Sequence, residues 1–321
     1  MKFKRFIPYI GIPLSTAAIA LVVLKYLFVI DANEWGVIVD VGESNQYREF
    51  VIDPNSPQDN AISSYEHDSL KYLDSCCSVR EPVLYIYSKI PIHMTIGIDF
   101  HSGLAALTYP RARYINRNRF EWQIRISPIS HTNLRIPQEY IRMQNFDAST
   151  IYSGNDTSSF LFYEGSTPIR LPLNVTLNER LDSVYVYNPN AFTALDVCVS
   201  IKPDYFHDPL NVCFDSIQPK KTQSGTGNSQ TALLNRLKND GFSESEARAF
   251  DYYWGEKMSA TYRRPFLVYS YLIPQKEIDK IASVKFSYPF VRFKRSIFYY
   301  HAQIEKIPVC KSYCHTPKCF R

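Results

Sequence analysis

Glycine is scarce in this chain, with 11 residues among 321, whereas Tyr, Phe and Pro number 24, 20 and 20. No Gly-rich loop of the kind that cradles phosphates is present, which argues against a P-loop or dinucleotide-binding enzyme. Long amphipathic helices are also scarce, while short runs rich in Val, Ile and aromatic residues are frequent. The composition therefore indicates a β-rich globular protein with a substantial core.

Catalytic signatures are lacking as well, because no nucleophile elbow and no paired-carboxylate motif accompanies any histidine. The seven histidines are scattered along the chain: His67, His93, His101, His131, His207, His301 and His315. Asp99 and Ser102 flank His101 at a turn, where a histidine more often caps the backbone than performs catalysis. We therefore expect no enzymatic activity and no cofactor.

One long apolar run is present, at residues 6–30, and residues 1–5 before it carry three positive charges. A helix of about 20 apolar residues crosses the hydrocarbon core of a membrane, and the positive flank favours a cytoplasmic N-terminus. No small-x-small cleavage motif and no lipid-attachment cysteine ends the run. We therefore predict a single-pass inner-membrane signal anchor with the bulk of the chain in the periplasm. A cleaved signal peptide and a buried core helix are the alternatives.

The rest of the chain divides by composition into four parts. Residues 31–75 are polar and irregular, and we expect them to be a connector between the membrane and the folded domain. Residues 76–217 carry the repeated strand pattern of a β-sandwich domain. Residues 218–230 indicate a linker or loop, and residues 231–321 combine a helical hairpin with basic, Cys-rich strands.

Alternating apolar and polar residues predict strands in the second of these parts, residues 76–217. In "FEWQIRI", Phe120, Trp122, Ile124 and Ile126 fall on one face and polar residues on the other. Seven or more such segments separated by turn residues predict a mainly β fold, an antiparallel sandwich or jelly roll. The other expected strands are "VLYIYSKIPIHMTIGIDF", "LRIPQEYIRMQNF", "SSFLFYE", "LPLNVTL", "DSVYVYNP" and "DVCVSIKP".

The period changes after residue 230, where a small helical hairpin is predicted. The segment "TALLNRLKND" ends on Gly241, a residue typical of helix C-termini. Ser243 and Glu246 then form an S-x-x-E capping box before "EARAFDYYWGEKMSAT".

Seven cysteines suit disulfide bonding outside the cytoplasm. Cys198 and Cys213 flank a turn between two expected strands, and a bond between them contributes about 3 kcal/mol for a loop of about 15 residues. The C-terminal spacing fits a structural zinc site poorly. We expect at least one of Cys76 and Cys77 to bond to the tail, with one cysteine left over. The remaining cysteines, whose pairing the sequence leaves open, are Cys76, Cys77, Cys310, Cys314 and Cys319.

The positive charge of the chain is a property of its C-terminal part, since 12 Lys/Arg and 3 Asp/Glu lie between residue 263 and residue 321. Within it, "YPFVRFKRSIFYYH" reads as a strand with apolar residues on both faces, which indicates a strand covered by a partner. An extracytoplasmic location argues against nucleic acid as that partner. The predicted interaction surface comprises Arg292, Lys294, Arg295, Tyr299 and Tyr300.

The order of signals from about residue 76 to 200 resembles the periplasmic maltose-operon protein family. The similar pieces are the Cys76-Cys77 pair, "IHMTIGI", the turn in "DFHSGLAALTYP", "FEWQIRISPIS", "LRIPQEYIRMQNFDA" and "NERLDSVYVYNPNAF". The resemblance implies a periplasmic β-sandwich accessory to carbohydrate uptake, without catalytic residues. The apolar run, the helical hairpin and the basic tail have no counterpart in the family, and they argue against a sugar-related role.

Two functions follow as expectations. The first is a membrane-anchored structural or scaffolding protein of a cell-envelope assembly, acting through contacts with other envelope proteins. The alternative is a carbohydrate-binding accessory protein, linked to maltose or maltodextrin uptake, for which an exposed aromatic platform is required. Trp35, Trp122 and Trp254 are the tryptophan candidates for that platform, although Trp122 lies on an apolar strand face.

Overall fold

The computed structural model describes residues 28–40, 77–130, 134, 136–227, 233–258 and 264–304. Among these residues, no helix is both long and apolar enough to cross a membrane. The predicted span at 6–30 lies outside them except for its last three residues, and Ile30 already begins a strand.

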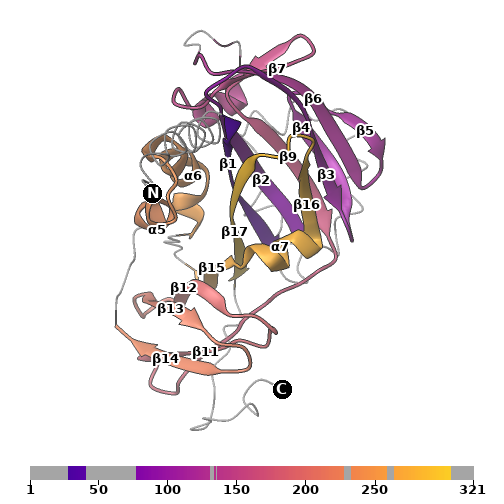
Figure 1. Ribbon diagram of the computed structural model, residues 1–321. Helices are drawn as coiled ribbons and strands as arrows, with labels where there is room; N and C mark the ends of the chain where they lie inside the picture. Colours follow the sequence, from indigo (N-terminus) through magenta and orange to yellow (C-terminus); the bar gives the residue numbers. More distant parts are fainter. Residues whose placement is uncertain are drawn as a thin grey trace, which may run out of the picture.

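The fold is mainly β and is built around a central sheet of eight strands (Figure 1). All neighbouring strands in this sheet are antiparallel except β1 and β17, which are parallel. In sheet order the strands are β13 (Leu210–Ile217), β12 (Ala194–Lys202), β15 (Phe266–Ile273), β17 (Val291–Ile304), β1 (Ile30–Asp40), β2 (Cys77–Tyr87), β9 (Leu161–Thr167) and β4 (Leu104–Tyr109).

Two smaller antiparallel sheets complete the β structure. The six-stranded sheet comprises β16 (Ala282–Phe286), β3 (Ile92–Phe100), β6 (Arg119–Ser127), β7 (Thr150–Ser153), β8 (Asp156–Ser158) and β5 (Arg113–Asn116), which pairs with β6. The three-stranded sheet comprises β10 (Asn174–Leu177), β11 (Ser183–Tyr187) and β14 (Thr222–Thr226). Side chains of both sheets share one hydrophobic cluster with one face of the central sheet, here called the sheet-covered face.

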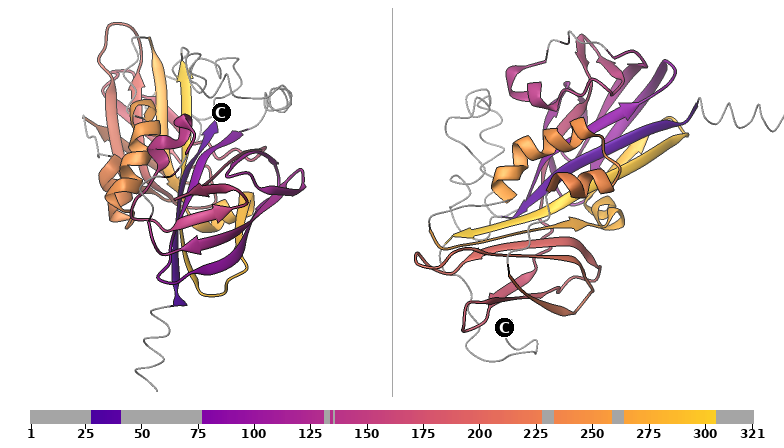
Figure 2. Two further views of the ribbon diagram at one scale, coloured as in Figure 1. Left: turned by 90° about the horizontal axis from the view of Figure 1, so that it is seen from above. Right: turned by 90° about the vertical axis from the view of Figure 1, so that its left-hand side faces the viewer.

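Helices cover the opposite face of the central sheet, here called the helix-covered face (Figures 1 and 2). The elements are the short 3-10 helix η1 (Gln138–Met143) and the hairpin formed by α5 (Leu233–Asn239) and α6 (Glu244–Met258). A further helix, α7 (Gln275–Ile281), joins β15 to β16. Side chains of β1 alternate between the two faces, so Trp35, Val37 and Val39 pack beneath the helices.

Several expected elements are present. Phe120, Trp122, Ile124 and Ile126 of β6 are all buried. The α5–α6 hairpin begins and ends near its predicted limits, and the capping box forms as expected. The Ser243 amide donates to Glu246 Oε2 at 2.6 Å, and the Glu246 amide donates to Ser243 Oγ at 3.2 Å.

Three expectations were wrong. Residues 31–40 are not connector but part of the fully paired strand β1, because β17 and β2 flank that strand on both sides. Residues 222–226, expected to be part of a linker or loop, form β14 and pair with β11. The segment containing Gln138–Met143 forms η1 instead of a strand, since Pro137 starts a turn and Tyr140 and Met143 pack beneath the central sheet.

Candidate functional site

The predicted interaction surface is mostly interior. Tyr299 and Tyr300 are 0% and 1% exposed, and the Arg295 side chain is 1% exposed. Both faces of β17 are indeed covered, but by elements of the same chain: the smaller sheets on one side and the α5–α6 hairpin on the other. The prediction was therefore wrong for these three residues. Arg292 is exposed and Lys294 is half-buried.

Arg295 of β17 belongs to a buried ionic cluster on the sheet-covered face that joins five elements: β17, β1, α7, β16 and β9. Its guanidinium donates to both oxygens of Glu34 on β1, to Asp279 Oδ1 on α7 at 2.9 Å and to the Ala282 carbonyl at 2.6 Å. Tyr163 on β9 donates its hydroxyl to Glu34. Burial alone would lower the pKa of Arg295, but the Glu34 carboxylate beside it raises that pKa. This cluster is a structural tie, because its charges are satisfied internally.

Tyr299 takes part in a second internal arrangement, at the other end of β1. Its hydroxyl donates to Asp40, and Nδ1 of His301 lies 3.7 Å from the same carboxylate. The ring of Tyr269 stacks on His301, with centroids 4.9 Å apart, and its hydroxyl accepts the Leu173 amide at 3.0 Å. Burial raises the pKa of the Tyr269 and Tyr299 hydroxyls far above the ordinary value, so both are neutral hydrogen-bonding groups.

The predicted Cys198–Cys213 disulfide is confirmed. The two cysteines face each other across β12 and β13, with Cα atoms 4.2 Å apart. Cys77 is buried at the start of β2. The other four cysteines, Cys76, Cys310, Cys314 and Cys319, lie outside the described residues, so their pairing stays a prediction.

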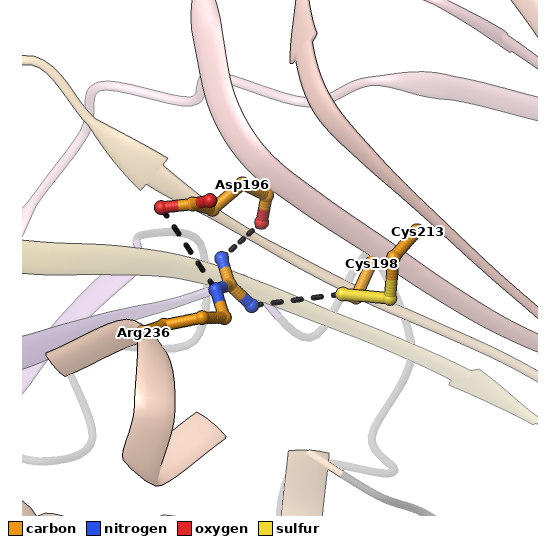
Figure 3. The surroundings of a disulfide bond; sticks show 4 residues. All are labelled: Asp196, Cys198, Cys213 and Arg236. Carbon is orange, nitrogen blue, oxygen red and sulfur yellow. Dashed lines mark hydrogen bonds and ion pairs between the residues drawn. A yellow bond between two sulfur atoms is a disulfide. The ribbon is translucent and has the colours of Figure 1, made fainter. Parts of the chain in front are cut away.

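Arg236 on α5 fastens the helical hairpin to the disulfide-bonded strands (Figure 3). It donates to the Asp196 carbonyl and lies 3.7 Å from Cys198 Sγ, while its guanidinium is 5.0 Å from the Phe298 ring centroid. Asp196 has a φ of 47° at the point where the pairing of β12 with β15 shifts register. Burial lowers the pKa of Arg236 and raises the pKa of Asp196. The β12–β13 hairpin is thus held in its middle by a covalent bond and near its base by a buried cation.

The tip of the same hairpin presents two exposed aromatic side chains. Tyr205 is 63% exposed and Phe206 is 93% exposed. The turn is ordered by Asp204, whose Oδ1 accepts the amides of Phe206 and His207 at 2.8 and 2.9 Å. Asp204 also contacts His207 Nδ1 at 2.8 Å, and this contact, with the backbone bonds, lowers the pKa of the carboxyl. We call residues 203–208 the aromatic tip, and it is our candidate protein-contact site.

A separate open groove lies on the outer surface of the six-stranded sheet. Its volume is about 570 Å³, and its lining contains more hydrogen-bonding than apolar side chains. The guanidinium of Arg125 lies over the Tyr152 ring, 4.1 Å from the centroid, so a cation covers this aromatic surface. The lining residues are His93, Met94, Thr95, Gln123, Ile124, Arg125, Tyr152, Gly154 and Ser287.

The tryptophans do not form a ligand platform. Trp35, Trp122 and Trp254 are each no more than 1% exposed, so the aromatic surface that a sugar would require is not supplied by them. In the part of the chain that the structure describes, no group of three or more His, Cys, Asp or Glu side chains is arranged to hold a metal ion.

In comparisons with known proteins, no family model and no curated protein matches the chain. The resemblance to the maltose-operon family therefore stays a prediction that rests on the sequence segments alone.

Proposed function

We propose that the protein is a membrane-anchored structural subunit of a cell-envelope assembly, with its β-sandwich domain in the periplasm, and that it contacts another envelope protein through the aromatic tip. The apolar run at residues 6–30 supports the anchor. The observation that carries the contact is Phe206, which is 93% exposed at the tip of a hairpin whose two strands are joined by a disulfide bond.

The tip has the physical properties of a preorganised contact. Aromatic side chains dominate binding energy when a partner buries them, and an ordered loop loses little entropy on binding. Asp204 fixes the turn and the disulfide fixes the strands, so Tyr205 and Phe206 are held outward before any partner arrives. A single exposed aromatic is common on protein surfaces, but two adjacent ones on a stapled turn indicate a contact.

In-cell photo-crosslinking tests this function. A photo-crosslinking amino acid at position 206 of the full-length protein is expected to give one discrete crosslinked product, while the same substitution at Ile115, which is 43% exposed on β5, gives none. Phe206→Ser should leave the amount of folded protein unchanged and remove the partner from a mild-detergent purification. A protein that crosslinks at neither position and purifies alone would contradict the scaffold role.

The groove supports carbohydrate binding as a second candidate function. Arg125 and Gln123 offer several N–H donors, and His93 and Ser287 add further polar groups, which suits the hydroxyl and carboxylate groups of an acidic sugar. Calorimetric titration with maltodextrins and with acidic oligosaccharides tests this. Binding that Arg125→Ala abolishes, and that Phe206→Ser leaves intact, would favour the carbohydrate role over the scaffold role.

A further inference from the structure

Aromatic side chains gather at the end of the domain where β1 begins. Phe28 and Phe290 are 42% and 58% exposed. The Tyr288 hydroxyl donates to the Phe28 carbonyl at 2.8 Å, and its ring meets Phe290 edge-on with centroids 5.9 Å apart. The amide of Ile30 donates to the Phe290 carbonyl at 2.9 Å, so the β16–β17 connection is attached directly to the start of β1. We call Phe28, Tyr288 and Phe290 the aromatic rim.

The predicted membrane span ends at this rim. The apolar run covers residues 6–30, and Ile30 is the first residue of β1, so no free linker separates the run from the folded domain. A domain joined in this way to a spanning helix is held within a few residues of the bilayer surface. Aromatic residues are the side chains that favour the boundary between headgroups and acyl chains.

Two basic residues flank the rim. Tyr87 pairs with Asp31 in the sheet, which brings the exposed Lys89, two residues further along, to the same end. Arg292 is exposed and forms an ion pair with Asp31, with its Nε 2.6 Å from Oδ1. Basic side chains next to a membrane are attracted to anionic headgroups. Aromatic and basic groups together, beside the end of an apolar run, match the chemistry of a lipid surface.

We infer that the aromatic rim docks on the surface of the bilayer, with Phe28 and Phe290 inserted at the headgroup boundary. This inference rests on the proposed membrane anchor and adds an orientation to it. The aromatic tip lies at the opposite end of the central sheet, because Lys202 of β12 is level with Phe266 and with Ile304, the last residue of β17 (Figure 2). A docked rim therefore directs Tyr205 and Phe206 away from the membrane.

Quenching by brominated lipids tests the inference on the full-length protein in phospholipid vesicles. The native tryptophans are buried and serve as a constant background. In Phe290→Trp, emission from the added indole should fall when brominated phospholipid replaces ordinary phospholipid. In the matched control Phe206→Trp, at a site 93% exposed, emission should not change. Vesicles with and without anionic lipid should show a deeper loss for Phe290→Trp in the anionic set.

Alkaline extraction of the same vesicles separates failure of the inference from failure of the anchor. Protein that stays in the membrane but shows equal quenching at positions 206 and 290, or none at 290, would overturn the docked rim and leave the anchor standing. A second copy of the chain covering the rim would give this unquenched result. Protein released by alkali would overturn the anchor itself, and the docked rim with it.

Discussion

Each face of the central sheet buries a carboxylate, Glu34 on the sheet-covered face and Glu246 on the helix-covered face, and the two are stabilised in different ways. On the sheet-covered face, Glu34 is 0% exposed and meets the cation of Arg295. On the helix-covered face, Glu246 of α6 is also 0% exposed, but it accepts hydrogen bonds from neutral donors: the Asn33 side-chain amide at 3.1 Å and the Ser243 backbone amide at 2.6 Å. One carboxylate is neutralised by a charge, and the other is solvated by dipoles.

The difference teaches what each contact does for the fold. The Glu34–Arg295 pair joins the first and last described strands, which are parallel neighbours in register, since Glu34 is directly opposite Arg295. A slip of one residue would carry Arg295 to the helix-covered face, away from Tyr163 and Asp279, and would place Lys294 or Ser296 opposite Glu34. We infer that this pair specifies the register of β1 against β17. Glu246 instead completes a helix cap, a local function that needs no opposite charge.

Removing the cation is expected to have the largest effect. Arg295→Met leaves Glu34 buried without its charged partner, and breaking a buried pair in this way lowers the free energy of unfolding by about 3–5 kcal/mol. Chemical denaturation followed by tryptophan fluorescence measures the loss. The double variant Glu34→Met/Arg295→Met removes both charges and should recover most of it. If the single variant were as stable as the wild type, the pair would not be the tie between these strands.

The sequence predicted the local features of this architecture and missed those that depend on distant strands. The alternation in β6 and the Ser243–Glu246 capping box are encoded within a few residues, and both were predicted. The strand β1 was not predicted, because no pattern within residues 31–40 indicates that β17, some 260 positions later, pairs with one of its edges. The predicted interaction surface was wrong at Tyr299 for a related reason. Apolar residues on both faces of a strand indicate that the strand is buried, but they do not indicate whether the covering element belongs to the same chain or to another.

The aromatic tip and the groove were also predicted only in part, namely for features that are encoded within a few residues. A turn between Cys198 and Cys213 was predicted, but only the structure places Phe206 of that turn at 93% exposure. Gln123 and Arg125 of the groove belong to the polar face that the alternation in "FEWQIRI" predicted. Tyr152 and Ser287 joined them without any sequence signal, because β7 and the β16–β17 connection reach the groove through sheet pairing.

Removing the Cys198–Cys213 disulfide should lower the free energy of unfolding by an amount that does not depend on either buried carboxylate. Cys198→Ser/Cys213→Ser opens a loop with a sequence separation of 15, and the free energy of unfolding should fall by about 3 kcal/mol, chiefly because the unfolded chain gains entropy. Denaturation of the wild type with and without reductant supplies a matched control. The loss should add to that of Arg295→Met, since the disulfide joins β12 to β13 whereas Arg295 contacts β1, α7, β16 and β9. If the two losses of free energy were strongly non-additive, the disulfide-bonded strands β12 and β13 and the ionic cluster around Arg295 would be energetically coupled.

The smallest effect, and the sharpest contrast between the faces, is expected from Glu246→Gln. Burial raises the pKa of Glu246 above its ordinary value of 4.5, although the bonds from Ser243, Tyr87 and Asn33 oppose the shift. The folded state therefore holds this proton more tightly than the unfolded chain does. Stability from this group is greatest below 4.5 and declines as the pH rises from that value through the raised pKa.

Glutamine keeps an oxygen for the capping box but cannot titrate, so Glu246→Gln should change stability near pH 4.5 by less than about 1 kcal/mol. As the pH rises towards neutrality, the variant should gain stability relative to the wild type, and denaturation curves at a series of pH values would record this gain. Ser243→Ala is the control, because it weakens the cap while leaving the carboxyl in place. Parallel pH profiles for Glu246→Gln and the wild type would mean that the neutral donors stabilise the Glu246 carboxylate as fully as water does.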